Sequence, residues 1–220
     1  MRHPRLAALR GPANRRTGDV VTGLALAALV VLPGAGRTTF DTKLDLVVDP
    51  VGFLARALSV WNPQSGLGEL QNQAVGYLFP IGPFFAAGQL AGVPPWLVQR
   101  SWQALLLVGA YAGARRLIGR LGVSAGWAGW LGALAYATGP RMLTTLGPLS
   151  AEALAVTMLP WILLPLVPGR TARPPWRAAA RSALGVLLLG GANATVTLAV
   201  LPLPALWLAT RRPGPARRRL

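Results

Sequence analysis

The sequence contains no cysteine, a single histidine, a single lysine and only six acidic residues among 220 positions. The absence of cysteine excludes disulfide bonds, thiol catalysis and cysteine-based metal sites. The one histidine, His3, lies in a basic N-terminal arm, which is no place for a catalytic group. Any chemistry must therefore depend on carboxylates, arginine, the lone Lys43, asparagine or glutamine.

Charge of either sign is scarce, because only 13% of the residues are charged and 53% are hydrophobic. The mean hydropathy is +0.46, whereas a soluble domain needs more charge to cover its surface. Several apolar runs approach or exceed the ~17–25 residues that span a bilayer. We therefore predict an all-α polytopic membrane protein that contacts the lipid bilayer.

The net charge of +16 would also suit a nucleic-acid-binding protein. The arginines, however, lie in short runs between apolar segments, which is typical of membrane proteins. No basic face with interleaved aromatic residues is present, so nucleic acid is not expected as a partner.

The arginine-rich start of the chain precedes an apolar run from Val20 to Gly36. This run is longer than the apolar part of a signal peptide, and no small-residue cleavage site follows it. We predict a first transmembrane helix with a cytoplasmic N-terminus, because short arginine-rich segments stay inside. The plasma (inner) membrane is the expected location.

The uncharged stretch from Tyr77 to Leu90 is interrupted by Pro80, Pro83 and two glycines. Its apolar pieces have the length of a re-entrant or juxtamembrane segment, so we predict that it does not cross. Further helices are expected at Pro95 to Ala114, Trp127 to Thr138, Glu152 to Val167, and Ala183 to Thr210, the last folded into a hairpin at Gly190 to Asn193. The total is roughly five or six spans.

This topology divides the chain into residues 1–17, a basic cytoplasmic arm, residues 18–210, the transmembrane domain, and residues 211–220, a basic cytoplasmic tail. The first external loop covers residues 37–94. Most arginines then lie inside, as the positive-inside rule requires. Five of the six acidic residues fall outside, namely Asp41, Asp45, Asp49, Glu69 and Glu152.

The stretch from Phe40 to Pro50 concentrates three of the six acidic residues and the only lysine. Asp49 followed by Pro50 is typical of a helix start, with the aspartate as N-cap. The helix behind it should be amphipathic and lie at the membrane surface, ending at Asn62–Pro63. Its apolar face comprises Phe53, Leu54, Ala57, Leu58 and Trp61.

Five segments resemble, in the same order, the N-terminal membrane region of the actinobacterial α-(1→3)-arabinofuranosyltransferases. They are FDTKLDLVVDPVGFLARAL, LQNQAVGYLFPIGPFF, VPPWLVQRSWQALLL, LAYATGPRMLTTLGPLSAEAL and GGANATVTLAVLPLPALWL. The resemblance runs from about Gly18 to Arg212 and implies the GT-C membrane-glycosyltransferase fold. Because members of this family are far longer, we expect the chain to be an N-terminal fragment or a truncated product.

The resemblance implies transfer of arabinofuranose from decaprenyl-phosphate-arabinose to cell-wall arabinan at the outer face. It also implies essential carboxylates in the first external loop, a position that Asp41 and Asp45 occupy here. A positioned carboxylate can accept the proton of an acceptor hydroxyl as the sugar transfers. We expect Asp41 as the base, since it lies closest to the preceding helix.

Other external residues are candidates for binding the donor and acceptor. An anionic lipid phosphate favours a nearby cation, for which Lys43, Arg56 and Arg141 are available. The amides of Gln71 and Asn72 could bind sugar hydroxyls, and the ring of Tyr77 could stack on sugar or isoprenoid. Glu152 is the last of these candidates for substrate binding. Two or three of the carboxylates could also hold Mg²⁺ or Ca²⁺, although the sequence does not require a metal ion.

Simpler roles compete with these assignments. Asp41, Lys43 and Asp45 could form a solvated loop with a local ion pair, while Glu152 could only favour a helix N-terminus. Arg141 could anchor a helix end, Tyr77 could belong to an interfacial aromatic belt, and Asn193 could bind lipid phosphate or pack between helices.

Three alternative functions remain at this point. One is transfer of another sugar, such as mannose, from a polyprenyl-phosphate donor. The second is a non-catalytic membrane subunit or a transporter, although a transporter should carry ionisable residues at mid-helix depth. The third is an inactive truncated fragment.

Overall fold

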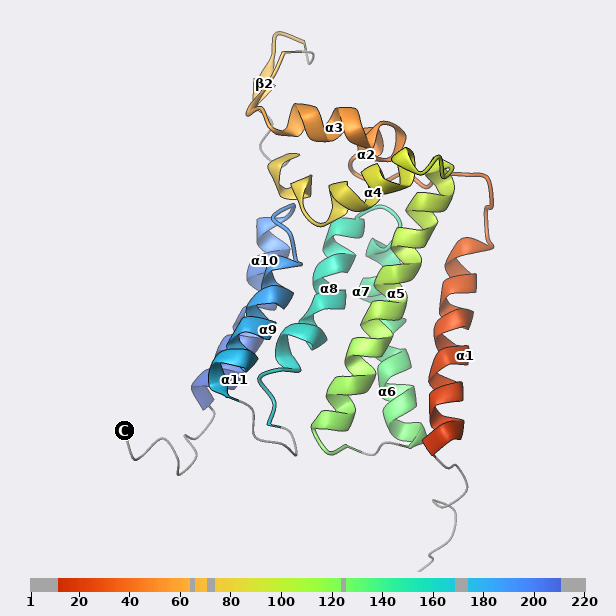
Figure 1. Cartoon of the computed structure of the whole chain (residues 1–220), viewed down its shortest axis with the longest axis vertical. Helices are drawn as coiled ribbons and strands as arrows, with labels where there is room; N and C mark the ends of the chain where they lie inside the picture. The colour runs from red at the N-terminus through yellow and green to blue at the C-terminus, as the bar shows by residue number, and fades with distance from the viewer. Residues whose placement is uncertain (1–11, 64–65, 71–73, 124–125, 169–173, 211–220) are drawn as a thin grey trace, which may run out of the picture.

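The computed structural model describes residues 12–63, 66–70, 74–123, 126–168 and 174–210. Figure 1 shows helices running along the long axis of the molecule, with shorter helices lying across one end. The lengthwise helices are α1 (Pro12–Val31), α5 (Pro95–Arg120), α6 (Trp127–Ala137), α7 (Pro140–Thr145), α8 (Ser150–Leu163), α9 (Pro175–Leu187), α10 (Ala194–Val200) and α11 (Pro202–Thr210).

The transverse layer at one end consists of short elements that follow α1 in the sequence. They are α2 (Leu44–Val48), α3 (Pro50–Ala57), the 3₁₀ helix η1 (Ala74–Leu78) and α4 (Ile81–Leu90). A two-residue antiparallel pair, β1 (Trp61–Asn62) and β2 (Glu69–Leu70), projects beyond α3. The segment from Tyr77 to Leu90 lies within this layer across the end of the bundle. That it does not cross the membrane stays a prediction.

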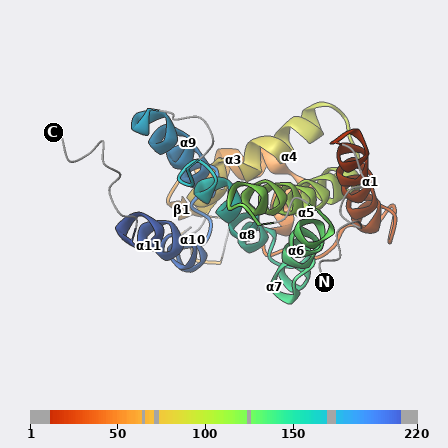
Figure 2. The same ribbon diagram turned by 90° about the horizontal axis from the view of Figure 1, so that it is seen from below.

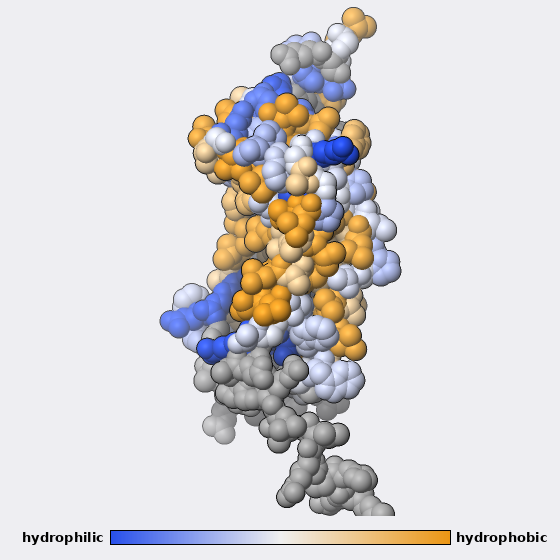
Figure 3. Space-filling view, turned by 90° about the vertical axis from the view of Figure 1, so that its right-hand side faces the viewer, coloured by the Kyte–Doolittle hydropathy of each residue, from blue (hydrophilic) through white to orange (hydrophobic). Residues whose placement is uncertain are grey.

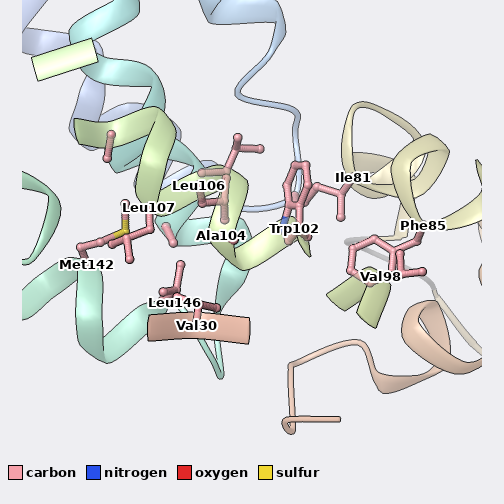
Figure 4. Close-up of a cluster of buried hydrophobic side chains, with 14 of the residues drawn as sticks. Val30, Ile81, Phe85, Val98, Trp102, Ala104, Leu106, Leu107, Met142 and Leu146 are labelled. Atoms are coloured by element: carbon pink, nitrogen blue, oxygen red, sulfur yellow. The ribbon is translucent and has the colours of Figure 1, made fainter. Parts of the chain in front are cut away.

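Helix α5 is the centre of the bundle and packs against α1, α6 and α8. Figure 2 shows α1 on one side of the α5, α6 and α8 group and α9 to α11 on the other. The close-up in Figure 4 shows side chains of α4, α5 and α7 meeting in one apolar cluster. Trp102, Leu106 and Leu107 of α5 are buried there beside Phe85 and Met142.

Small residues bring α5 and α8 into close contact. A Cβ atom at Gly109 would lie 2.9 Å from Thr157, and one at Gly113 would lie 2.7 Å from Trp161. Close approach of this kind is what glycine permits between membrane helices. Two side chains of α8 also donate to α5 carbonyls, Thr157 to Leu106 at 2.9 Å and Trp161 to Gly109 at 3.0 Å. These bonds satisfy polar groups inside an apolar interface.

The chain reverses direction at residues 188–193, between α9 and α10, as the hairpin prediction required. The α10 end of this turn approaches the transverse layer, because a Cβ atom at Gly76 would lie 2.2 Å from the backbone of Gly191. Consequently α11 ends at the same end of the bundle at which α1 begins.

Several predicted helix bounds were wrong. Helix α5 continues past the predicted end at Ala114 to Arg120, and α9 begins at Pro175 instead of Ala183.

The first helix and the helix after Asp49 also differ from the prediction. The first helix begins at Pro12 and ends at Val31, because Gly34 and Gly36 take positive φ angles of 70° and 80° that end the regular backbone. The helix after Asp49 ends at Ala57 instead of reaching Asn62. Leu58 and Trp61 are consequently exposed, and Trp61 belongs to β1. The sequence also failed to predict α7.

Among the described residues, no helix is both long enough and apolar enough to cross a membrane. Helix α5 has the length, with 26 residues, but Gln99, Arg100, Gln103 and three further arginines interrupt its apolar character. The predicted number of spans therefore stays a prediction. Figure 3 shows apolar side chains across the middle of the face viewed there, with hydrophilic residues concentrated toward its ends.

Candidate functional site

The loop between α1 and α2 carries Asp41 and is fixed by two glutamines of α5. The side chain of Gln99 accepts from the Thr39 amide at 2.8 Å and donates to the Thr39 carbonyl at 2.8 Å. Gln103 donates to the Thr39 hydroxyl at 3.0 Å. Both glutamines are almost fully buried, at 1% and 2% exposure. The Gln99 side-chain amide thus bonds both the N–H and the C=O of Thr39, as the backbone of a neighbouring β-strand would.

Asp41 is a buried carboxylate with hydrogen-bond donors on both oxygens. Its side chain is held by Ser150, whose hydroxyl donates to Oδ2 at 2.6 Å, and by Thr42, which donates to Oδ1 from its amide at 2.7 Å and its hydroxyl at 3.0 Å. The residue is only 7% exposed. Burying a carboxylate is costly unless it is hydrogen-bonded, so these three donors are what permit its position.

Asp45 lies in the first turn of α2 and pairs with Arg56 of α3. The guanidinium and carboxylate are 3.8 Å apart, and the side chains are 36% and 53% exposed. Arg56 also contacts Asp49 at 3.5 Å. The cation beside Asp45 is therefore Arg56, where the sequence suggested Lys43. Lys43 occupies the N-cap position of α2 and makes no side-chain capping bond.

Asp49 is the N-cap of α3, as its position before Pro50 predicted. Its Oδ1 accepts from the Gly52 amide at 3.0 Å, and Pro50 stands at the start of the helix. The capping role is confirmed. Asp49 therefore has a structural role, whereas Asp41 and Asp45 remain the candidates for catalysis.

Glu152 lies in the first turn of α8 and joins three helices. It forms an ion pair with Arg141 of α7 and accepts from Asn193 Nδ2 at 3.1 Å. The Glu152 side chain is 14% exposed, whereas that of Arg141 is 64% exposed. Asn193 also caps α10 through the Val196 amide, at 3.2 Å. The bond to Glu152 is the packing contact between helices predicted for Asn193, and contact with lipid phosphate stays a prediction.

Tyr77 lies where the electrostatic fields of three carboxylates meet. Burial raises the pKa of its phenol, and the negative charges of Asp41, Asp45 and Glu152 raise the pKa further, while a hydrogen bond with Thr42 opposes them. The ring packs edge-on against Phe53, with centroids 5.9 Å apart, and the residue is 5% exposed. Stacking of the Tyr77 ring on sugar or isoprenoid would need one face of this buried ring to be open to the ligand, and it stays a prediction.

The structure thus brings Asp41, Asp45, Tyr77 and Glu152 into one neighbourhood, with Arg56 and Arg141 at its exposed edges. Gln71 and Asn72 lie outside the described residues. Within the described ranges, no group of three or more acidic or histidine side chains is arranged to hold a metal ion.

Sequence reasoning missed the residues that hold these groups. Gln99 and Gln103 are spaced by four in α5, and this spacing could have marked them as one buried polar face. Nothing in the local sequence of Ser150 indicated that it would contact a residue 109 positions away.

A second concave surface lies between the lengthwise helices. It is a groove of about 760 Å³, lined mainly by apolar side chains of α4, α5, α8 and α9. Phe84 of α4 and Trp102 of α5 belong to its lining, as do two cations, Arg120 at the end of α5 and Arg181 of α9.

The family model that matches this chain gives its class, a glycosyltransferase with the GT-C fold. Residues 25–220 match the family model described as alpha-(1->3)-arabinofuranosyltransferase, N-terminal GT-C domain. The chain belongs to this family, as the resemblance in the sequence indicated, and glycosyl transfer is the activity of its named relatives.

Two curated relatives carry the name alpha-(1->3)-arabinofuranosyltransferase. The protein of Mycobacterium tuberculosis (strain ATCC 25618 / H37Rv) is 43% identical over 206 residues, which is 92% of this chain and 15% of the relative. The protein of Mycolicibacterium smegmatis (strain ATCC 700084 / mc(2)155) is 44% identical over 195 residues, which is 87% of this chain and 14% of the relative. The chain therefore spans only a small part of the length of these relatives.

The fold is similar to a solved structure, the single-particle cryo-EM structure of arabinofuranosyltransferase AftD from Mycobacteria. The match has a TM-score of 0.85 at 41% identity and covers 91% of this chain and 15% of that chain. A second structure, of the R1389S mutant of the same protein, has a TM-score of 0.84 at 42% identity and covers 90% of this chain and 16% of that one.

Proposed function

We propose that this chain contributes the catalytic carboxylates of a membrane arabinofuranosyltransferase. The reaction is transfer of arabinofuranose from decaprenyl-phosphate-arabinose to cell-wall arabinan at the outer face of the plasma membrane. The observation that carries the proposal is the buried, triply hydrogen-bonded Asp41. Such a carboxylate is held in one orientation, as a general base must be.

In this reaction the acceptor hydroxyl oxygen attacks the anomeric carbon of the arabinose. The bond from that carbon to the phosphate oxygen breaks, and its electron pair leaves with the lipid phosphate. The hydroxyl proton passes to Asp41, since Oδ2 retains acceptor capacity beside the Ser150 bond. Asp45, half-exposed and paired with Arg56, is the second proposed catalytic carboxylate.

The exposed cations would contact the donor phosphate. Arg141 presents most of its side chain to solvent while Glu152 fixes its position, and arginine is well suited to bind phosphate. Lys43 and Arg56 are the other cations, and Gln71 and Asn72 remain candidates for sugar hydroxyls. The apolar groove between α5, α8 and α9 is a surface of the kind that an isoprenoid chain requires.

The proposed topology has the transverse helices at the outer face and both ends of the chain in the cytoplasm. Residues 1–17 and 211–220 are then cytoplasmic, residues 18–210 form the membrane domain, and residues 37–94 form the first external loop. The arginine distribution was used to assign the sides, so the support is the distribution of acidic residues, five of which fall in segments assigned to the outside.

The test is an assay of a chimera in which this chain replaces the matching N-terminal segment of the Mycolicibacterium smegmatis relative. Transfer from decaprenyl-phosphate-arabinose is measured in isolated membranes. Asp41→Asn should lower kcat by roughly a hundredfold or more, because it removes the proton acceptor. Asp45→Asn should also lower transfer.

Asp49→Asn is the matched control, since asparagine caps helices as well as aspartate does, and it should retain full activity. Normal turnover of Asp41→Asn would contradict the proposed base. A chimera without substitutions that transfers no arabinose would contradict the proposed function as a whole.

A further inference from the structure

The position of Asp41 is set by two helices that are rigidly joined to each other. From α5, Gln99 and Gln103 hold Thr39 through three hydrogen bonds of 2.8 to 3.0 Å. From α8, Ser150 holds the carboxylate itself at 2.6 Å. The two helices are in turn joined through the Thr157 hydroxyl and the Leu106 carbonyl, 2.9 Å apart. The loop therefore has little freedom to move relative to either helix.

The Ser150 hydroxyl does something different from the other buried hydroxyls of the bundle. Thr145 donates to a carbonyl four residues earlier in its own helix, at 2.7 Å, which is the usual local bond of such residues. Thr157 shares its donation between such a carbonyl, at 3.0 Å, and the Leu106 carbonyl of α5, at 2.9 Å. The hydroxyl of Ser182 donates to the Ile162 carbonyl at 2.9 Å. Ser150 instead donates to a charged acceptor on a distant loop, and a bond to an ionised group is the stronger kind.

Ser150 is also placed where a negative charge is favoured. It is the first residue of α8, and the N-terminal residues of a helix carry a partial positive charge. The residue is 3% exposed, so little water competes for its hydroxyl. The Thr42 amide, which donates to the other carboxylate oxygen, also donates to the Pro148 carbonyl at 3.2 Å. The Asp41 loop and the start of α8 thus form one hydrogen-bonded unit.

We propose that Ser150 is a positioning residue for the reaction, because its hydroxyl fixes Oδ2 of Asp41 in the orientation that accepts the proton. This inference rests on the proposed function, in which Asp41 is the base. Ser150 acts only through Asp41, to whose carboxylate its hydroxyl donates. Without its hydroxyl, the carboxylate would keep only the Thr42 donors on Oδ1 and could rotate about its Cβ–Cγ bond.

The test uses Ser150→Ala in the chimera described above. We expect kcat for arabinose transfer to fall roughly ten- to hundredfold, as for loss of a hydrogen bond to a charged group. The KM for the lipid donor should change less than about twofold, because Ser150 contacts no donor group. Ser150→Thr retains a hydroxyl at this position and should restore most of the lost kcat.

Ser182→Ala is the matched control, because it removes a buried serine hydroxyl that bonds a backbone carbonyl away from Asp41. It should leave kcat and KM unchanged. Full activity of Ser150→Ala alongside an inactive Asp41→Asn would overturn the positioning role and leave the proposed base intact. An equal loss of kcat in Ser150→Ala and Ser182→Ala would also overturn it, because a general packing defect would then explain both. Normal turnover of Asp41→Asn would instead contradict the proposed function.

Discussion

Arg56 contacts two carboxylates, those of Asp45 and Asp49, and these two differ in their other contacts. Asp49 keeps a backbone hydrogen bond to Gly52 in addition to the ion pair, whereas the contact of Asp45 with Arg56 spans 3.8 Å between half-exposed groups. Exposed ion pairs contribute little to stability because water screens them and the side chains lose freedom. An N-cap satisfies a helix N–H that has no partner in its own helix.

Asp49→Ala should therefore destabilise the protein by about 1 kcal/mol, as loss of an N-cap does. Asp45→Asn should change the free energy of unfolding by less than about 0.5 kcal/mol. Unfolding of the purified chain in detergent, followed by circular dichroism, measures both. An effect of Asp45→Asn equal to that of Asp49→Ala would show that the ion pair matters more than its exposure indicates.

At the scale of single residues, the sequence allowed the local roles to be predicted but not the distant partners. Asp49 could be assigned as a cap because its partner lies three residues away and Pro50 follows. The contact between Asp41 and Ser150 depends on how α8 packs, and the pairing of Asp45 with Arg56 depends on the angle between α2 and α3. Neither arrangement can be derived from spacing alone.

At the scale of elements, η1 and the turn after α9 touch backbone to backbone. Gly76 makes this approach possible, since the atoms nearest to a Cβ there would be Gly191 C at 2.2 Å and Ala192 N at 2.3 Å. Gly190 in the same turn has a φ angle of 67°, which glycine adopts without strain. The adjacent glycines Gly190 and Gly191 made the hairpin predictable, whereas nothing in the sequence predicted its contact with η1.

Gly76→Ala should destabilise the fold by roughly 1–3 kcal/mol, because backbone atoms cannot yield to the added methyl group as a flexible side chain can. Gly119→Ala is the matched control. Gly119 lies in α5 with nothing within 4 Å of its Cβ position, and alanine there should stabilise the helix by up to about 1 kcal/mol. Melting temperatures in detergent should move in opposite directions, and equal shifts would contradict the close approach.

At the scale of the whole molecule, the two ends carry different charges. Asp41, Asp45 and Glu152 gather at the end of the bundle where the transverse helices lie. At the opposite end Asp19 of α1 binds Tyr111 and Arg115 of α5, at 2.6 and 3.1 Å. The overall class was predictable from composition and from the order of motifs, because both are properties of the whole chain. The bounds and tilt of each helix depend on packing, which composition does not specify.

The lack of cysteine allows this orientation to be tested directly by single-cysteine labelling. Leu67→Cys lies at a fully exposed position beyond α3, and Gly119→Cys lies at an exposed position near the end of α5. A membrane-impermeant thiol reagent added to intact cells should label Leu67→Cys. It should label Gly119→Cys only after the membrane is permeabilised, and the reverse pattern would contradict the proposed topology.

The two hydrogen bonds between the Gln99 side chain and the Thr39 backbone also limit how the chain can vary in length. Only two residues separate Thr39, which is fixed to α5, from Thr42, whose amide is fixed to the Pro148 carbonyl. In extended backbone, one added or deleted residue sends the next side chain to the opposite side. An insertion at this point would therefore turn the carboxylate away from Ser150, whereas point substitutions leave its direction unchanged.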